Sequence, residues 1–381
     1  MRNFELIGLL IFIISFSVCC NIFDSHNEDP EEVQLDLLWN YPYEYEGWGP
    51  ELTPTAIFDS LVVMTGDHNI TCLFTGSGEV KWTIKVTDEG SSVLQDIKYD
   101  NTQVYGYELY TGIFALDINT GLKNWEYGIS DRDRFDRFYD ISSTNYYLGT
   151  YDDTSSYIWS FTKNGGLNYK KQLNNKIWGI RYYNGKIYCS SGWWTLGPRE
   201  HGQITCYEAD TGDSLWSYYV ADKGGFYRVP PIIEDGILYC GTVYGDPKAI
   251  VVALDAETGE EIWQFSHEGE YAEFHDIKLA DGVLYCSTQN ALLAIDAATG
   301  EELWFTQPIF SHNENTLAYM DGYIYFPHSG YLFILEAETG EIVKKMLTPD
   351  KSRVQKCSTG AGRLFVQSGM HLYCYEVVTK K

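Results

Sequence analysis

Short runs of alternating hydrophobic and polar residues follow one another along most of the chain, and turn residues separate them. One run ends in Ala253-Leu254-Asp255, the pair Thr258-Gly259 follows, and a second run carries Ile262-Trp263. Such alternation is typical of a half-buried β-strand, and a glycine between two runs permits the positive φ that a tight hairpin turn needs. The pattern therefore predicts hairpins of antiparallel strands.

This hairpin recurs with a period of about 40 to 47 residues. A second clear copy spans residues 294–304 and ends in Leu303-Trp304. Weaker copies carry their turn glycine at Gly78, Gly121, Gly165, Gly212 and Gly340. A further hairpin lies upstream, as in residues 232–240 and 279–286. Two hairpins per period predict four-stranded antiparallel sheets, and this period is typical of propeller blades or solenoids.

An eighth repeat is split between the two ends of the chain. Near the C-terminus only residues 362–366 and 371–375 remain, and no outer strand with a tryptophan follows them. The segment around Trp39 can supply that strand, which would close the ring and remove free sheet edges. We therefore expect an all-β fold, an eight-bladed β-propeller of four-stranded antiparallel blades closed by an N-terminal strand, as a single domain over residues 35–378.

The N-terminal segment has the pattern of a secretory signal peptide over residues 1–19. Arg2 precedes the apolar run Leu6–Val18, which is too short to span a bilayer comfortably. The ending Val18-Cys19-Cys20 resembles a bacterial lipobox, which implies lipidation of Cys20 or, as the alternative, Cys19. A plain signal peptide cut nearby is a further alternative. Residues 20–34 are acidic and poor in apolar side chains, which predicts a flexible tether.

The charge of the chain narrows the classes of partner. Its 27 Lys and Arg stand against 53 Asp and Glu, a formal net charge of −26. Such a surface repels phosphate backbones, so we expect no nucleic-acid partner. Neutral ligands, cations and proteins remain open.

The repeat also resembles a known family. The sequence Ala-Leu-Asp-x-x-Thr-Gly-x-x-x-Trp is similar to the repeat of the pyrroloquinoline-quinone-like propellers, and the resemblance covers about residues 35–378. The size, the lipid anchor and the eight blades look most like BamB-like lipoproteins. That resemblance implies a scaffold at the outer-membrane β-barrel assembly machinery.

Quinoprotein dehydrogenases share the repeat, and this resemblance implies a cofactor under a vicinal disulfide and a Ca²⁺ site of oxygen ligands. The only adjacent cysteines are Cys19-Cys20 in the export signal, so we expect no cofactor and no enzymatic activity. The seven other cysteines fall at repeat positions and are expected to be small core residues. A disulfide between Cys189 and Cys206, on neighbouring strands, is the alternative.

Three aspartates suggest a site at the central channel. Asp96, Asp140 and Asp276 are expected at comparable positions near the start of the innermost strand. They could ring one channel mouth and hold a cation through carboxylate oxygens. The alternative is that each carboxylate accepts hydrogen bonds from nearby amides.

Three segments depart from the repeat and are predicted as loops. In residues 192–202, Trp193, Trp194, Arg199 and His201 could bind a protein or stack on a sugar, whereas the alternative is that the indoles cover a blade edge. Residues 131–138 form a basic island and are expected to pair their own charges. Residues 312–315 are too short to separate a ligand site from a turn.

The sequence therefore favours an exported, monomeric, non-enzymatic β-propeller, anchored in the outer membrane through a lipid at its periplasmic face or at the cell surface. Its partners would be proteins, including an outer-membrane barrel assembly complex. The alternative function is a surface-exposed lipoprotein that binds carbohydrate or another small molecule. A quinoprotein dehydrogenase is the third.

Overall fold

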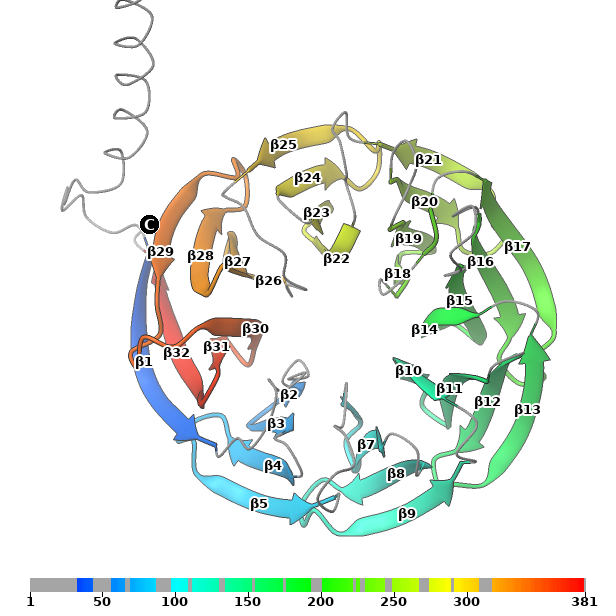
Figure 1. The fold of residues 1–381 in the computed structure, drawn as a ribbon, viewed down its shortest axis with the longest axis horizontal. Helices are drawn as coiled ribbons and strands as arrows, with labels where there is room; N and C mark the ends of the chain where they lie inside the picture. Colours follow the sequence, from blue (N-terminus) through cyan, green and yellow to red (C-terminus); the bar gives the residue numbers. More distant parts are fainter. Residues whose placement is uncertain are drawn as a thin grey trace, which may run out of the picture.

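Eight four-stranded antiparallel sheets follow one another around a closed ring in the part of the chain that the structure describes (Figure 1). The structure is a computed structural model, and it describes residues 33–43, 56–65, 69–86, 97–108, 112–129, 134–152, 155–173, 176–192, 201–221, 224–226, 230–243, 249–266, 274–288, 291–307 and 317–379. The predicted eight-bladed propeller is confirmed. These described residues contain no helix that is long and apolar enough to cross a bilayer.

Each blade runs from an innermost strand at the centre to an outermost strand at the rim. The first four blades in chain order contain these strands: in blade 1 β2 (Ala56–Phe58), β3 (Leu61–Thr65), β4 (Asn69–Phe74) and β5 (Val80–Lys85); in blade 2 β6 (Lys98–Tyr99), β7 (Gln103–Glu108), β8 (Gly112–Asp117) and β9 (Lys123–Gly128); in blade 3 β10 (Arg134–Ile141), β11 (Asn145–Tyr151), β12 (Ser156–Thr162) and β13 (Leu167–Leu173); in blade 4 β14 (Ile177–Tyr183), β15 (Lys186–Gly192), β16 (His201–Glu208) and β17 (Ser214–Ala221).

The remaining four blades have the same order, except that the last one takes its outermost strand from the N-terminus. They contain these strands: in blade 5 β18 (Ile232–Glu234), β19 (Ile237–Gly241), β20 (Val251–Asp255) and β21 (Glu261–Phe265); in blade 6 β22 (Phe274–Ala280), β23 (Val283–Thr288), β24 (Leu292–Asp296) and β25 (Glu302–Thr306); in blade 7 β26 (Ala318–Met320), β27 (Tyr323–His328), β28 (Tyr331–Glu336) and β29 (Ile342–Met346); in blade 8 β30 (Val354–Gly360), β31 (Arg363–Ser368), β32 (His371–Thr379) and β1 (Val33–Pro42).

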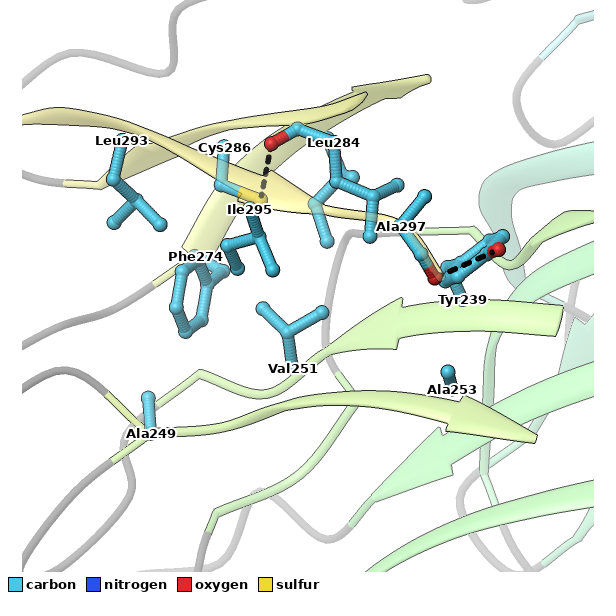
Figure 2. Close-up of a cluster of buried hydrophobic side chains, with 11 residues drawn as sticks. Tyr239, Ala249, Val251, Ala253, Phe274, Leu284, Cys286, Leu293, Ile295 and Ala297 are labelled. Carbon is cyan, nitrogen blue, oxygen red and sulfur yellow. Dashed lines mark hydrogen bonds between the residues drawn. The ribbon is translucent and has the colours of Figure 1, made fainter. Parts of the chain in front are cut away.

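The core of the molecule lies between neighbouring blades. Figure 2 shows one such layer, in which Val251 and Ala253 of blade 5 face Leu293 and Ile295 of blade 6. The two middle strands of a blade are covered on both faces, so they are nearly continuous apolar runs, whereas outer strands such as β13 alternate between exposed and partly buried residues. Burial of these apolar layers is the main stabilising contribution, at roughly 25 cal/mol per Å².

The Thr-Gly turn between the two outer strands has a local cause. At the turn after β24, one carboxylate oxygen of Asp296 accepts hydrogen bonds from the backbone N–H of Thr299 at 2.8 Å and from its hydroxyl at 2.9 Å. These bonds lower the pKa of the Asp296 carboxyl. Gly300 then adopts a φ of +76°, a conformation that L side chains rarely accept. The predicted positive-φ turn is confirmed.

One side chain of each outermost strand connects its blade to the next. In blades 1 to 6 it is the aromatic residue four positions after that glycine, in blade 7 Lys344 has that position, and in blade 8 it is Trp39 of the N-terminal strand. Its polar group donates to a backbone carbonyl of the following blade, so a hydrogen bond spans every junction of the ring. The donors and acceptors are Trp39 and Thr75, Trp82 and Ile118, Trp125 and Lys163, Tyr169 and Ala209, Trp216 and Ala256, Trp263 and Ala297, Trp304 and Ala337, and Lys344 and Val33.

The N-terminal strand closes the ring, as the sequence predicted. β1 pairs antiparallel with β32 from Val33 opposite Thr379 to Pro42 opposite His371. Trp39 then donates to blade 1 at 2.9 Å, and Lys344 of blade 7 donates to the Val33 carbonyl at 3.4 Å. The strand begins two residues before the expected domain start at residue 35, inside the segment assigned to the tether.

The described cysteines are all buried and none of them forms a disulfide, which agrees with the expected role as small core residues. The alternative disulfide between Cys189 and Cys206 is wrong. β15 and β16 pair Cys189 with Thr205 and Tyr188 with Cys206, so the two thiols are one register step apart and point to opposite faces of blade 4. Cys19 and Cys20 lie outside the described residues.

Candidate functional site

The innermost strands enclose a central cavity. It has a volume of about 700 Å³, and residues from all eight blades line it. Its charged lining residues in the described part of the chain are Lys98, Arg181, Asp276 and Lys278. A chain with a net charge of −26 therefore places three cations and one carboxyl along its axis.

The three cations share one position of the repeat. Strand pairing sets Lys98 opposite Tyr105 in blade 2, Arg181 opposite Tyr188 in blade 4, and Lys278 opposite Tyr285 in blade 6. In each case the tyrosine is the third residue of the second strand. The hairpin turn therefore fixes the depth of all three cations in the channel.

Asp140 occupies the same position in blade 3, opposite Tyr147. It lies between the blades of Lys98 and Arg181, with oxygen-to-nitrogen distances of 4.0 Å to Lys98 Nζ and 3.6 Å to Arg181 Nη1. Its carboxylate also accepts the backbone N–H of Tyr182 at 2.8 Å. Asp140 therefore offsets part of this positive charge and connects three consecutive blades.

Asp276 is not at the position of Asp140. It pairs with Ser287 and lies two residues before Lys278, farther from the hairpin turn. Its carboxylate accepts the backbone N–H of Leu317 in blade 7 at 2.7 Å. The expectation of comparable positions is therefore wrong for this pair. The sequence comparison aligned the blades at the start of the innermost strand, whereas the hairpin turn at the end of that strand sets which residues pair. Both carboxylates accept amide hydrogen bonds, but from the neighbouring blade and not within a turn, as the alternative had expected. Asp96 lies outside the described residues.

Burial raises the pKa of the Asp276 carboxyl to about 6, although the Leu317 amide, Lys278 and Lys356 oppose the shift. The folded state thus binds this proton more tightly than the unfolded chain. The protonated Asp276 carboxyl therefore stabilises the fold fully below about pH 4, and this stabilisation is lost as the pH rises through 6. We expect Asp276→Asn, which keeps the acceptor for Leu317, to increase the free energy of unfolding by about 1–2 kcal/mol at pH 8 and hardly at all at pH 4.

Urea denaturation of both proteins at the two pH values measures this difference. The matched control is Asp235→Asn, which changes an exposed turn aspartate and should alter the free energy of unfolding by less than about 0.5 kcal/mol. An equal gain for Asp276→Asn at pH 4 and pH 8 would contradict the assigned proton.

The described channel residues do not fit the calcium and quinone site that the family resemblance implies. Ca²⁺ takes six or more oxygen ligands, whereas the charged lining residues in the described part of the chain are two lysines, an arginine and a single carboxyl, Asp276. Among the described residues, no three His, Cys, Asp or Glu side chains come together in a way that could hold a metal ion.

The predicted loops lie mostly outside the described residues. This holds for Trp193, Trp194, Arg199 and residues 312–315, and His201 is the first residue of β16. The basic segment 131–138 is not wholly a loop, because β10 begins at Arg134 and pairs with β11. The alternating charges of this segment suggested a loop, whereas its second part is a strand whose pairing register shifts between Phe135 and Tyr139.

Sequence reasoning missed the cationic positions Lys98, Arg181 and Lys278. The signal that could have found them is their distance from the hairpin turn, because each of the three precedes a tyrosine by seven residues across that turn. Comparison of the hairpins by turn instead of by strand start would have placed Asp140 with these cations.

Comparison with protein families gives a match at the level of sequence. The family model described as outer membrane protein assembly factor BamB matches residues 149–280 and 275–346, just over half of the chain. This chain belongs to the BamB-like family of β-propellers. A comparison with curated protein sequences gives no match.

Solved structures share the BamB-like fold at low sequence identity. BamB from Moraxella catarrhalis is 14% identical with a TM-score of 0.65, and the match covers 90% of this chain and 98% of that one. The designed protein Ika8 is 14% identical with a TM-score of 0.66, covering 87% and 98%. The quinohemoprotein alcohol dehydrogenase from Comamonas testosteroni is 12% identical with a TM-score of 0.69, covering 91% and 76%. An assembly factor, a designed protein and an enzyme share this fold, so the fold does not decide the function.

Proposed function

We propose that this protein is a non-enzymatic, lipid-anchored scaffold that holds protein partners during outer-membrane protein assembly. The observation that carries the proposal is the family match, because the model that recognises this sequence describes an assembly factor. The dehydrogenases are similar in fold alone. The export signal predicted for residues 1–19 and lipidation at Cys20 or Cys19 would place the propeller at the outer membrane.

The chemistry of the channel is consistent with a scaffold. Asp140 lies within ion-pair distance of Lys98 and Arg181, and the Nε of Arg181 also donates to the Pro231 carbonyl at 2.9 Å. These contacts join the innermost strands of blades 2 to 5. A rigid ring with fixed inner strands is suited to present inter-blade loops to partners.

Affinity capture of the tagged full-length protein from the membrane fraction of its native host tests the proposal. We expect mass spectrometry to identify an outer-membrane assembly barrel among the captured proteins. Loss of that barrel from captures with Trp193→Ala and Trp194→Ala combined would assign the contact to residues 192–202, because indoles of this kind dominate protein interfaces.

The melting temperature of the double variant is the control for folding, and we expect it to stay within about 2 °C of the parent value. A large fall would show that the two indoles are structural. A capture that reproducibly contains no assembly protein would contradict the scaffold and favour the alternative, a lipoprotein that binds carbohydrate or another small molecule.

A further inference from the structure

A second cavity lies between blades 3 and 4, away from the central channel. It has a volume of about 440 Å³, within the range of small-molecule sites. β13 forms one wall, and β15, β16 and β17 form the other. We call it the blade 3/4 pocket and define its polar wall by Ser191, Gln203, Thr205, Tyr207 and Ser217.

The corresponding face of blade 6 shows what the repeat normally places there. Strand pairing matches Cys189 and Thr205 in blade 4 with Cys286 and Leu293 in blade 6, and Tyr207 with Ile295. In blade 6 these side chains are buried in the interface with blade 5 (Figure 2). The blade 3/4 pocket therefore exists where polar residues replace aliphatic ones.

The position of Thr205 is apolar and buried in most other blades. The residues there are Phe114 in blade 2, Trp159 in blade 3, Val252 in blade 5, Leu293 in blade 6 and Phe333 in blade 7. Blade 1 has Thr71 at this position, and Leu73 on the same face is fully buried. A threonine at this position thus occurs in blade 1 as well, but only in blade 4 do Ser191, Gln203 and Tyr207 lie beside it on the same face.

The opposite wall is changed as well. Lys171 of β13 occupies the position that Phe265 has in blade 5, where the phenyl ring packs against the inter-blade core. The ammonium of Lys171 pairs with Asp213 at 2.6 Å. This pair neutralises the rim of the pocket, and the wall behind it consists of uncharged groups.

The polar wall is a connected row of hydrogen-bonding groups. The Ser191 hydroxyl donates to the backbone carbonyl of Gln203 at 3.0 Å, the side-chain amide of Gln203 donates to the Thr205 hydroxyl at 3.0 Å, and the Thr205 and Ser217 hydroxyls are 3.1 Å apart. Hydroxyl and amide groups both donate and accept, which is also the chemistry of sugar hydroxyls. The net charge of −26 disfavours anionic ligands.

We propose that the blade 3/4 pocket binds a neutral sugar of one or two hexose units. The sugar hydroxyls would bond to Gln203, Thr205 and Ser217, and the Tyr207 ring would add apolar surface. The site is separate from the central channel, and Ser191 and Gln203 of its wall flank residues 192–202, the segment proposed for the protein contact. Sugar binding goes beyond the proposed function and can fail without it.

Isothermal titration of the full-length protein in detergent tests this site. The probes are glucose, galactose, mannose, N-acetylglucosamine, maltose, cellobiose and lactose, and citrate is the anionic control. We expect at least one of the seven sugars to bind with a Kd of about 1 mM or lower and citrate not to bind. Failure of all seven sugars to bind would overturn the proposal.

Variants then assign the binding site. We expect Thr205→Val, which restores the residue of blade 5, and Ser217→Ala each to weaken the best sugar at least tenfold while the melting temperature stays unchanged. The matched control is Thr71→Val at the same position in blade 1, which should bind like the parent. Unchanged affinity in Thr205→Val and Ser217→Ala would overturn the assignment, as would loss of binding in Trp193→Ala and Trp194→Ala alone.

Discussion

Deletion of residues 33–43 is expected to lower the melting temperature by at least about 10 °C and to broaden the unfolding transition. The deletion removes β1, and with it the partner of β32 along its whole length. It also removes the Trp39 bond to blade 1 and the carbonyl of Val33 that Lys344 reaches. Two neighbouring junctions of the ring then lose their hydrogen bonds, and β32 is left as a long free edge.

Circular dichroism during thermal unfolding measures this effect, and single variants on the same strand separate its causes. Trp39→Ala should cost about 3 kcal/mol, since it removes a half-buried indole and its bond to the Thr75 carbonyl. Leu38→Ala is the control, because that side chain is 40% exposed and should cost less than about 0.5 kcal/mol. A deletion variant that unfolds at the parent temperature with the same sharpness would show that the ring does not depend on β1.

The fold could be predicted because its determinants are local and repeated. A glycine with positive φ, usually followed four positions later by an aromatic residue, marks the outer hairpins in one short stretch of sequence, and in blades 2, 5 and 6 an Asp before it accepts from a Thr. The sequence could also predict the closing strand, because an incomplete last repeat requires an outer strand from elsewhere. It did not reveal the function of Lys344, which replaces the usual aromatic residue and still donates to the next blade.

The candidate sites were harder to predict, because they depend on register between blades and on faces of a sheet. Asp140 and Asp276 look alike in sequence, yet Asp140 lies between two cations. Asp276 lies two residues from the repeat position of Asp140, and the pKa of its carboxyl is raised. The blade 3/4 pocket escaped notice for a related reason. Thr205 looks like an ordinary polar strand residue until pairing places it at a position that is apolar in most other blades.

Gly300→Ala is expected to destabilise the protein by about 3–5 kcal/mol, whereas Gly282→Ala should cost only about 1–2 kcal/mol. Both glycines have nearly the same φ, +76° and +77°, so both variants carry the strain of a left-handed alanine. A methyl group on Gly282 would meet open space. On Gly300 it would lie 2.6 Å from the Trp263 ring, so the indole has to move, and its 3.0 Å bond to the Ala297 carbonyl weakens.

Urea denaturation of the two variants measures the difference, and a double-mutant cycle identifies its source. In a Trp263→Ala background the indole is absent, so Gly300→Ala should cost no more than Gly282→Ala. Equal costs of the two glycine variants in the parent protein would contradict the argument that close contact between each indole and the next turn stabilises the ring. Confirmation would assign that stability to a contact that the repeat encodes twice, once in the aromatic residue and once in the glycine beneath it.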